Sequence, residues 1–479
     1  MIRSGTNLFR GAGKGSGLRC QICTGCGLCP GAAVDRLQVE VAASGAETGR
    51  GQAEADSSAA AENREKGRIL HVLAEDALLG KKFPLKAGGR RLVTADIGTT
   101  TIAMLLYHED GSVADRYVAV NPQTMYGADV LSRIREARRP EHAHRMRKQV
   151  EEVLEKGLER FSRELAEGES LSMVLAANTT MTYLFMGWDA EELGQAPFEA
   201  SRLGAVERQV AGVPCFVFPG LSAFVGGDIA AGIYACRMEE REELTLLVDL
   251  GTNGEMVLGN RHRRVACATA AGPAFEGGAN AGIWGADMVS LLARLLEENV
   301  MDATGLLAPE YFDKGIRIGN VLVTQGAVRS IQLAKAAIAA GIEILLEKYG
   351  IRGEQVDRVV LAGGFGYYLR PTAAARIGLL PKELADKAVT GGNTALAGAL
   401  LAGRRILSGE TMADAVQGEG DRPCAGTGII GSAAHTLAVQ LERMAGDTEV
   451  VNLAMEAGFD GRYVENMDFP HWDVSGQGA

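Results

Sequence analysis

Two stretches of the chain, far apart in sequence, repeat one pattern of residues that can do chemistry. In each, an apolar run ends in an Asp and a Gly, followed by hydroxyl or amide side chains and a second apolar run. The residues are Asp96, Gly98, Thr99, Thr100 and Thr101 in the first stretch, and Asp249, Gly251, Thr252, Asn253 and Gly254 in the second. The pattern predicts a β-hairpin whose turn offers N–H groups and hydroxyls to phosphate oxygens, with the Asp beside it to hold Mg²⁺ or its waters. One such turn also fits an ordinary hairpin capped by its own Asp, but two predict a duplicated domain that holds one nucleotide from both sides.

A third element adds a glycine cluster to the two turns. The run 359–362 is typical of a short buried strand, and Gly363, Gly364 and Phe365 follow it. Backbone without side chains can approach a flat ligand closely, so we expect these residues to line an adenosine pocket. Phe365 alone equally fits a core position.

A further acidic candidate lies between the second turn and the glycine cluster. Glu276, in a Gly-rich loop, is expected to bind nucleotide or position a water; a plain turn residue is the alternative. Gly272, shortly before it, is a candidate nucleotide-binding residue. Asp96, Asp249 and Glu276 are therefore the candidate catalytic residues.

Four closely spaced cysteines form a separate candidate site near the N-terminus. Cys20, Cys23, Cys26 and Cys29 follow a C-x2-C-x2-C-x2-C pattern and precede Pro30. Cysteines this close pair poorly as disulfides, but four thiolates can converge on one metal centre. The spacing is one residue shorter than the bacterial ferredoxin run and favours an iron–sulfur cluster, [4Fe–4S] above all. A structural Zn²⁺ site and a non-binding thiol tail are the alternatives. The scattered Cys215, Cys236, Cys267 and Cys424 are expected to be small buried hydrophobes.

Composition excludes several classes of function. The 479 residues carry a net charge of −11, which argues against a nucleic-acid binder. The longest basic cluster, 133–148, is interleaved with Glu and His and predicts a solvated helix face. No run approaches about 18 uninterrupted apolar residues, and the N-terminus lacks an apolar signal region, so we expect a cytoplasmic protein without a membrane span.

The chain divides into four predicted parts. Residues 1–31 form a Cys-rich iron–sulfur segment and 32–86 a flexible linker rich in Ala, Gly, Glu and Ser. Lobe I covers 87–240 and lobe II covers 241–479. Strands are expected at 91–106, 112–120, 171–177, 246–258 and 359–362, with a turn at 178–180. Helices are expected at 128–138, 142–165, 228–235, 286–298, 327–348 and 394–406. This alternation predicts two α/β lobes.

The order of the three elements resembles the phosphate-1, phosphate-2 and adenosine motifs of the superfamily of acetate and sugar kinases, Hsp70 and actin. That resemblance implies a two-lobed, duplicated ribonuclease-H-like ATPase fold of the α/β class, here with a short N-terminal cysteine-rich metal-cluster segment. It also implies that Thr99, Thr100, Thr252 and Asn253 contact the β- and γ-phosphates.

The blocks between these motifs narrow the resemblance to one family, the reductive activators of corrinoid-dependent methyltransferases. The resemblance covers about 92–470 and includes short blocks at 121–123, 126–129, 177–182, 196–198, 225–228, 270–277, 333–338 and 463–470. It implies ATP-dependent, one-electron reduction of an inactive Co(II) corrinoid to Co(I), with the electron delivered by iron–sulfur centres. A corrinoid protein, a low-potential donor such as a ferredoxin, and a second copy of the chain in a homodimer are the implied partners.

The chain departs from the best-known members ahead of the ATPase module. Those members carry a plant-type [2Fe–2S] domain there, whereas this chain has only the short Cys loop and the linker. Three alternatives stay open: a small-molecule kinase of the same superfamily, an activator of another low-potential enzyme such as a 2-hydroxyacyl-CoA dehydratase, and a binding scaffold whose nucleotide state sets partner affinity.

Overall fold

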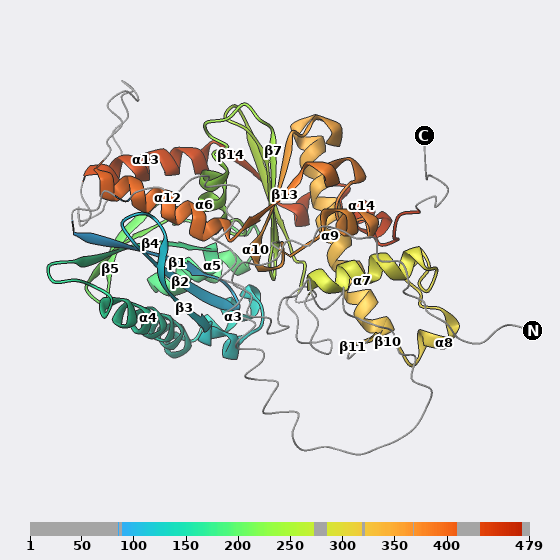
Figure 1. The fold of residues 1–479 in the computed structure, drawn as a ribbon, viewed down its shortest axis with the longest axis horizontal. Coiled ribbons are helices and arrows are strands. Elements are labelled where there is room, and N and C mark those ends of the chain that lie inside the picture. The colour runs from blue at the N-terminus through green and yellow to red at the C-terminus, as the bar shows by residue number, and fades with distance from the viewer. Residues whose placement is uncertain are drawn as a thin grey trace, which may run out of the picture.

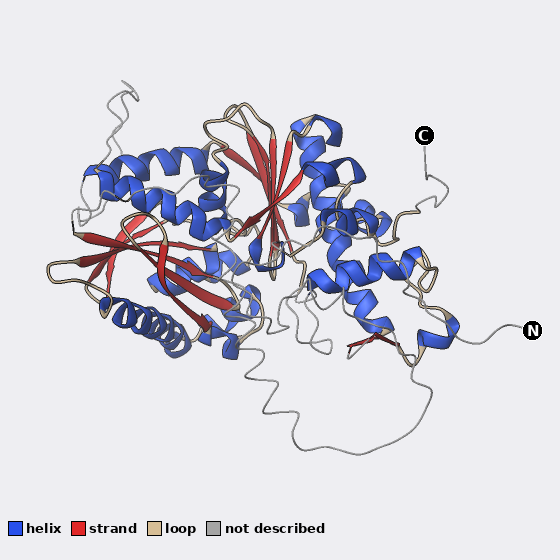
Figure 2. Cartoon of the chain, in the orientation of Figure 1, coloured by secondary structure: helices blue, strands red, loops and turns tan. Residues whose placement is uncertain are grey.

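Two six-stranded mixed sheets form the framework of the computed structural model, which describes residues 85, 89–272, 285–318, 321–366, 368–409 and 432–471 (Figures 1 and 2). The first sheet has the order β3-β2-β1-β4-β6-β5, and the second has the order β13-β12-β7-β8-β9-β14. In both, an antiparallel hairpin sits beside parallel strands, which is the expected duplication of an α/β plan. The four cysteines of the N-terminal cluster and Glu276 lie outside the described residues.

The first sheet is built on the hairpin of β1 and β2. Its strands are β1 (Arg90–Ile97), β2 (Thr101–Tyr107), β3 (Val113–Val120), β4 (Ser170–Ala177), β5 (Val206–Val210) and β6 (Val213–Val217). Val93, Ala95 and Ile97 alternate along β1 and pack with α4 (Pro140–Ser162) and α5 (Thr179–Met186) in one core. Leu92 points to the opposite face and joins a second core, so the strand is buried on both sides.

The second sheet repeats this plan around β7 and β8. Its strands are β7 (Thr245–Leu250), β8 (Gly254–Gly259), β9 (Arg264–Thr269), β12 (Arg358–Ala362), β13 (Ala388–Gly392) and β14 (Thr448–Val451). The long helix α9 (Gln325–Tyr349) packs against β8 and β9, and its Ala- and Ile-rich middle is almost wholly buried. Smaller elements on this side are α7 (Gly285–Glu297), α8 (Pro309–Phe312), β10 (Ile316–Ile318), β11 (Val321–Val323), α11 (Pro371–Arg376) and α14 (Phe459–Glu465).

Two helices rich in small residues join the sheets. Helix α6 (Gly227–Cys236) contacts β4 of the first sheet and β7 of the second, while α12 (Thr394–Ser408) contacts β1, β4 and α6. A Cβ atom on Gly398 would collide with the Ala231 carbonyl oxygen, so the two helix backbones approach as closely as glycine permits. Helix α13 (Ser432–Gly446) lies beside α12 (Figure 1). Although α12 belongs to the second half of the chain, it packs on the first sheet; the lobe boundary at 240/241 stays a prediction.

Every helix and strand expected within the described residues is present, and one local expectation is wrong. Asn178 to Thr180, expected as a turn, instead start α5: the Asn178 Oδ1 atom accepts a hydrogen bond from the Met181 N–H at 2.9 Å and caps the helix. An Asn that ends a strand and caps a helix looks like a turn residue in sequence, because the same side-chain geometry serves both.

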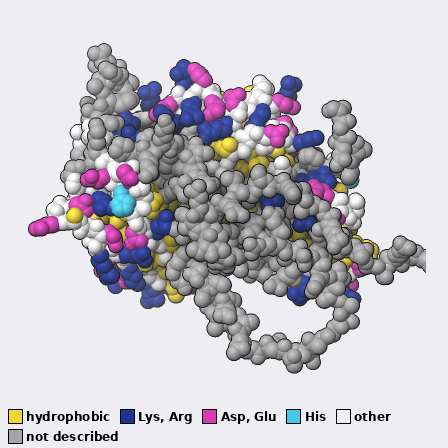
Figure 3. Space-filling view, viewed as in Figure 1, with side chains coloured by type: hydrophobic (Ala, Val, Ile, Leu, Met, Phe, Trp, Pro, Cys, Tyr) yellow, Lys and Arg dark blue, Asp and Glu magenta, His cyan; other side chains and the backbone are white. Residues whose placement is uncertain are grey.

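The basic cluster at 133–148 spans α3 (Val130–Ala137) and the start of α4, and most of it is solvated as expected. Arg139 pairs with Glu136 at 3.2 Å and Arg147 with Glu151 at 3.1 Å. Figure 3 shows positive and negative side chains interspersed over the described surface that faces the viewer. Arg133 is the exception: it is fully buried, so its assignment to a solvated face is wrong. No helix in the described ranges has the length and apolar character that a membrane span requires.

Three scattered cysteines behave as predicted. Cys215, Cys236 and Cys267 are buried and form no disulfide, and burial raises the pKa of the Cys215 thiol to about 12. The Cys215 and Cys267 thiols, both with a pKa raised by burial, therefore stay protonated, and all three cysteines act as small core side chains. Cys424 lies outside the described residues.

Glu239, just beyond the end of α6, is a half-buried acid whose two carboxyl oxygens are shielded from solvent. Neither carboxyl oxygen has a hydrogen-bond partner among the described residues, and burial raises the pKa of the group to about 7. Because the folded-state pKa lies above the unfolded value, the protonated form is the stable one, and stability falls as pH rises from about 4.5 through 7. We expect the free energy of unfolding of Glu239→Gln to exceed that of wild type by about 1–2 kcal/mol at pH 8.5 and to equal it at pH 5. Urea denaturation at the two pH values measures both. An equal difference between the two proteins at both pH values would contradict a carboxyl whose pKa is raised by burial.

Candidate functional site

The two Asp-Gly hairpin turns face each other at the edges of the two sheets. The hydroxyl oxygens of Thr100, between β1 and β2, and Thr252, between β7 and β8, lie 3.5 Å apart. Each turn is closed by its own backbone: the Gly98 N–H donates to the Thr101 carbonyl at 2.9 Å, and the Gly251 N–H donates to the Asn253 carbonyl at 2.9 Å. The structure thus brings together two predicted phosphate-binding turns that are remote in sequence.

Four carboxyl groups gather beside these turns. Asp96 is next to last in β1; Asp249 in β7 is the antiparallel partner of Glu255 in β8; and Asp228 lies in the first turn of α6. Burial is the largest cause of a raised pKa in each: about 6 for Asp96, about 7 for Asp228 and about 8 for Asp249, and well above the usual range for Glu255. Mutual repulsion adds to this shift, since Asp96 acts on Asp228 and both act on Asp249. A cation brought to this cluster therefore relieves an unfavourable charge arrangement.

The acids are not arranged as a closed metal cage. In the part of the chain that the structure describes, no group of three or more His, Cys, Asp or Glu side chains is placed to enclose a metal ion directly. This donor set suits a hard, oxygen-preferring ion that keeps most of its own waters, which is the ordinary behaviour of Mg²⁺.

The first turn is braced by three buried side chains. The Asn121 amide donates to the Gly98 carbonyl at 2.8 Å, and the Arg133 guanidinium donates to the Thr99 carbonyl at 2.6 Å. The Asn178 amide donates to the Thr99 hydroxyl at 3.2 Å. These bonds fix the backbone of the turn, so a ligand that binds there meets a backbone that is already ordered. The bond to the Thr99 carbonyl explains why Arg133 is buried.

The glycine cluster lies against the second turn. Gly363 follows β12 as the first residue of α10 (Gly363–Gly366) and has a φ of +81°; a Cβ atom there would lie 2.5 Å from Asp249 Oδ1 and 2.6 Å from the Leu250 carbonyl oxygen. Gly364 is exposed, and a Cβ atom there would meet nothing within 4 Å. Gly363 therefore keeps space for the Asp249 carboxyl, while Gly364 leaves backbone open to a ligand.

We expect Gly363→Ala to be strongly disruptive and Gly364→Ala to leave stability nearly unchanged. The first change adds a methyl group against Asp249 in a backbone conformation unfavourable to L-residues, which costs about 1–3 kcal/mol. Thermal unfolding of the two variants checks this. Equal melting temperatures for both would show that the backbone relaxes freely around residue 363.

The remaining predicted site residues have mixed surroundings. Thr101 starts β2, and Gly254 starts β8, where a Cβ atom would lie 3.1 Å from Ile338 of α9; Gly254 thus has a packing role as well. Gly272 has a φ of +70°, a backbone conformation that favours glycine. The side chain of Phe365 lies outside the described part of the structure.

Sequence reasoning missed three residues at the site. Asp228 follows the Gly226–Gly227 pair, and Glu255 stands directly after the second turn. Asn393, the N-cap of α12, donates from its amide to Asp96 Oδ2 at 2.7 Å. The Gly pair directly ahead of Asp228 was an available signal in the sequence, because glycines mark places where backbone segments approach closely. In the structure, a Cβ atom on Gly226 would collide with Asn178. Asn393 gave no signal beyond that of an ordinary helix cap.

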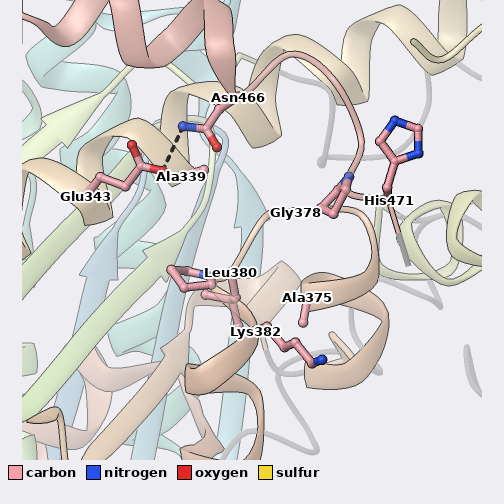
Figure 4. Close-up of a pocket in the computed structure, with 10 residues that line it drawn as sticks. Ala339, Glu343, Ala375, Gly378, Leu380, Lys382, Asn466 and His471 are labelled. Atoms are coloured by element: carbon pink, nitrogen blue, oxygen red, sulfur yellow. Dashed lines mark hydrogen bonds between the residues drawn. The ribbon is translucent and has the colours of Figure 1, made fainter. Parts of the chain in front are cut away.

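A separate cavity of about 480 Å³ lies along α9, between that helix, the segment after α11 and the C-terminal residues (Figure 4). Glu343 accepts a hydrogen bond from the Asn466 amide at 3.0 Å on one side of it, and Lys382 and His471 are also in its lining. None of the hairpin, carboxylate or glycine-cluster residues lines this cavity, so it is distinct from the site described above.

Comparisons with known proteins agree on one family. Residues 92–241 match the model of the RACo middle region, and residues 243–281 and 278–418 match the model of the C-terminal, ASKHA domain of RACo. The corrinoid activation enzyme RamQ of Eubacterium limosum is 29% identical over 359 residues, which are 60% of this chain and 60% of that protein. A solved structure of a reductive activator for a corrinoid, iron–sulfur protein superposes with a TM-score of 0.66 at 27% identity, over 80% of this chain and 67% of that one.

The chain thus spans about three fifths of the length of the curated relative that it matches. The two family models adjoin and cover the region that carries both hairpins, Asp228 and the glycine cluster. The α/β fold, with its paired sheets, is the one expected for the ASKHA superfamily. On this evidence the chain belongs to the family of reductive activators of corrinoid-dependent methyltransferases.

Proposed function

We propose that this protein is an ATP-hydrolysing activator that passes one electron to an inactive Co(II) corrinoid protein and so restores Co(I). The observation that carries the proposal is the pair of facing hairpins with its four raised-pKa carboxyl groups, in a family of corrinoid activators. The electron balance is simple: a reduced low-potential donor such as a ferredoxin is oxidised by one electron, and cobalt is reduced from Co(II) to Co(I).

The nucleotide roles follow from position. Thr99, Thr100, Thr252 and Asn253 hydrogen-bond the β- and γ-phosphates from the two turns, and Gly363, Gly364 and Phe365 line the adenosine pocket. Asp96 and Asp249 hold the water shell of Mg²⁺, which supplies charge neutralisation for the phosphates when bound. Among the remaining acids, Asp228, Glu255 and Glu276 are the candidates to orient the attacking water. The raised pKa values of Asp228 and Glu255 match the need for a group that accepts a proton near neutral pH.

The redox role rests on the N-terminal cysteines. Cys20, Cys23, Cys26 and Cys29 hold the iron–sulfur cluster, which supplies one-electron chemistry when present. The segment between them and the ATPase body is long enough to let the cluster reach both a donor and a docked partner. We also propose that the active species is a homodimer formed through the ATPase body.

ATP is needed because the electron moves uphill. Each 100 mV of unfavourable potential costs about 2.3 kcal/mol per electron, so a gap of a few hundred millivolts blocks transfer without coupling. If the ATP-bound state binds the partner more tightly in its Co(I) form than in its Co(II) form, the difference in binding free energy raises the cobalt potential during the encounter and so favours reduction.

Reduction of a corrinoid protein tests the function directly. We expect the anaerobic, reduced protein to convert a Co(II) corrinoid protein to Co(I), followed by its visible spectrum, with Mg·ATP but not with ADP. The ATPase rate should change when the Co(II) protein is added, and the Co(I) form should bind more weakly once ATP has been hydrolysed, so that the product leaves. Equal affinity for both cobalt states with an unchanged ATPase rate would contradict ATP-driven transfer. ATP turnover that requires a small phosphate acceptor would instead favour a kinase.

A further inference from the structure

The start of α12 contacts the carboxyl groups of both hairpins. Asn393 is the N-cap of this helix, and its amide nitrogen donates to Asp96 Oδ2, in the first sheet, at 2.7 Å. Thr394, the next residue, is completely buried, and its hydroxyl is near enough to Asp249, in the second sheet, to lower the pKa of that carboxyl. Two consecutive residues therefore meet two acids that come from different sheets.

The two contacts differ in kind. The Asn393 bond has full hydrogen-bonding geometry, whereas the Thr394 hydroxyl lacks a partner at that geometry among the described residues. A Cβ atom on Gly232 of α6 would lie 3.1 Å from the Thr394 oxygen, so glycine at that position leaves room for the hydroxyl. A buried hydroxyl without a well-formed hydrogen bond is energetically unfavourable. A small movement of Asp249 toward Thr394 would form that bond and so lower the free energy.

Helix α12 is also a stiff support. It packs on β1, β4 and α6. The backbone of Gly398 lies so close to the Ala231 carbonyl that α6 and α12 cannot shift toward each other. Helix α6 in turn carries Asp228 in its first turn. The N-termini of two locked helices thus bring Asp228, Asn393 and Thr394 to the same carboxyl cluster. An acid that contacts this pair of helices is therefore held in one orientation.

We propose that Asn393 and Thr394 are positioning residues that set the orientation and spacing of Asp96 and Asp249 for the Mg²⁺-nucleotide complex. Asn393 occupies one oxygen of Asp96, which leaves the other oxygen for a metal-bound water. Thr394 provides the matching contact for Asp249 as the two hairpins close on the phosphates. This inference rests on the proposed nucleotide function and adds to it the helix that couples the two halves of the site.

The decisive variant separates the capping role of Asn393 from its contact with Asp96. The Asn393 Oδ1 atom caps α12 by accepting from the Leu396 N–H at 2.8 Å, and Ser preserves such a cap but is too short to reach Asp96. We expect Asn393→Ser to melt within about 2 °C of wild type. Its dissociation constant for Mg²⁺ with a non-hydrolysable ATP analogue, measured by calorimetry, should rise at least tenfold. Affinity for the analogue in EDTA should change less than twofold, because the defect concerns the metal.

Matched variants complete the test. Asn393→Asp keeps the cap but places a like charge beside Asp96, and we expect an even larger loss of Mg²⁺-dependent binding. Thr394→Val removes the hydroxyl without changing shape and should also weaken binding. Asn452→Ser alters another Asn cap, which is not at the site, and should change nothing. Wild-type affinity in Asn393→Ser, while wild type itself binds the analogue with Mg²⁺, would overturn the inference. Failure of wild type to bind any nucleotide would instead overturn the proposed function, and this inference with it.

Discussion

Asp249→Asn should abolish Mg²⁺-dependent ATP hydrolysis while making the protein more resistant to heat at alkaline pH. The carboxylate is proposed to hold the water shell of Mg²⁺ beside the second turn, and an amide of the same size cannot supply that charge. Loss of one preorganised electrostatic group at a reacting centre costs about 10²–10³ in kcat, and loss of the metal itself costs more. A steady-state phosphate-release assay at saturating Mg·ATP measures the effect.

The stability half of this prediction follows from the sign of the pKa shift. Burial and the neighbouring acids raise the pKa of Asp249 to about 8, far above that of an unfolded Asp. The folded state therefore holds the proton more tightly, and wild type loses stability as pH rises from about 4 through 8, whereas the Asn variant does not. We expect the melting temperature of Asp249→Asn to exceed that of wild type at pH 9 and to equal it near pH 4.

Two controls make the result specific. Asp96→Asn should lose turnover in the same way, because the site is two-sided. Asp115→Asn, which removes an acid that pairs with Arg160 at 2.7 Å on the surface of α4, should leave turnover unchanged. Near-normal hydrolysis in a folded Asp249→Asn protein would remove Asp249 from the mechanism.

The parts of the fold that sequence predicted are those whose signals are local. Both hairpins combine buried, β-favouring strands with Gly-containing turns, and long helices such as α4 and α9 show a sustained helical period. The hairpin of β5 and β6 escaped prediction because its two-residue turn is Ala211–Gly212. Both residues have positive φ, which Asn-Gly or Asp-Gly signals far more clearly than Ala-Gly does. Strand β13 is short and ends in two glycines, so it carries almost no strand signal of its own.

Residues of the candidate site could be predicted from sequence only where they stand in a recognisable local pattern. Asp96, Asp249 and Gly363 each stand in a recognisable local pattern, and the structure brings their segments together. Arg133 was misjudged because its sequence neighbours are exposed cations, while its own side chain turns inward to the Thr99 carbonyl. Asn393 and Asp96, which share a hydrogen bond, are 297 residues apart in the sequence. A contact of that sequence separation depends on how the sheets and helices pack, and no window of sequence contains it.

The cysteine loop should be dispensable for ATP hydrolysis and indispensable for reduction of the corrinoid. Four thiolates at this spacing predict one cluster, with roughly four irons per chain if it is [4Fe–4S]. Since both hairpins and the glycine cluster lie beyond residue 89, removing cluster ligands leaves the nucleotide site intact. We expect the double variant Cys23→Ser/Cys26→Ser, purified anaerobically, to lose its brown colour and its iron. Its rate of Co(II) reduction should fall at least a hundredfold, while its ATPase rate stays within twofold of wild type.

The buried thiols of the body provide the matched control for that variant. Cys215→Ala removes a cysteine from β6 whose raised pKa keeps it protonated, so the iron content should not change. Deleting residues 1–67 should reproduce the double variant and leave nucleotide binding in place. The alternatives give different results: stoichiometric zinc without iron after anaerobic reconstitution would favour a nucleotide-controlled scaffold. Undiminished cobalt reduction without Cys23 and Cys26 would mean that the electron takes another path. Loss of ATP hydrolysis together with the cluster would show that the N-terminal segment acts on the nucleotide site, which a purely redox role does not require.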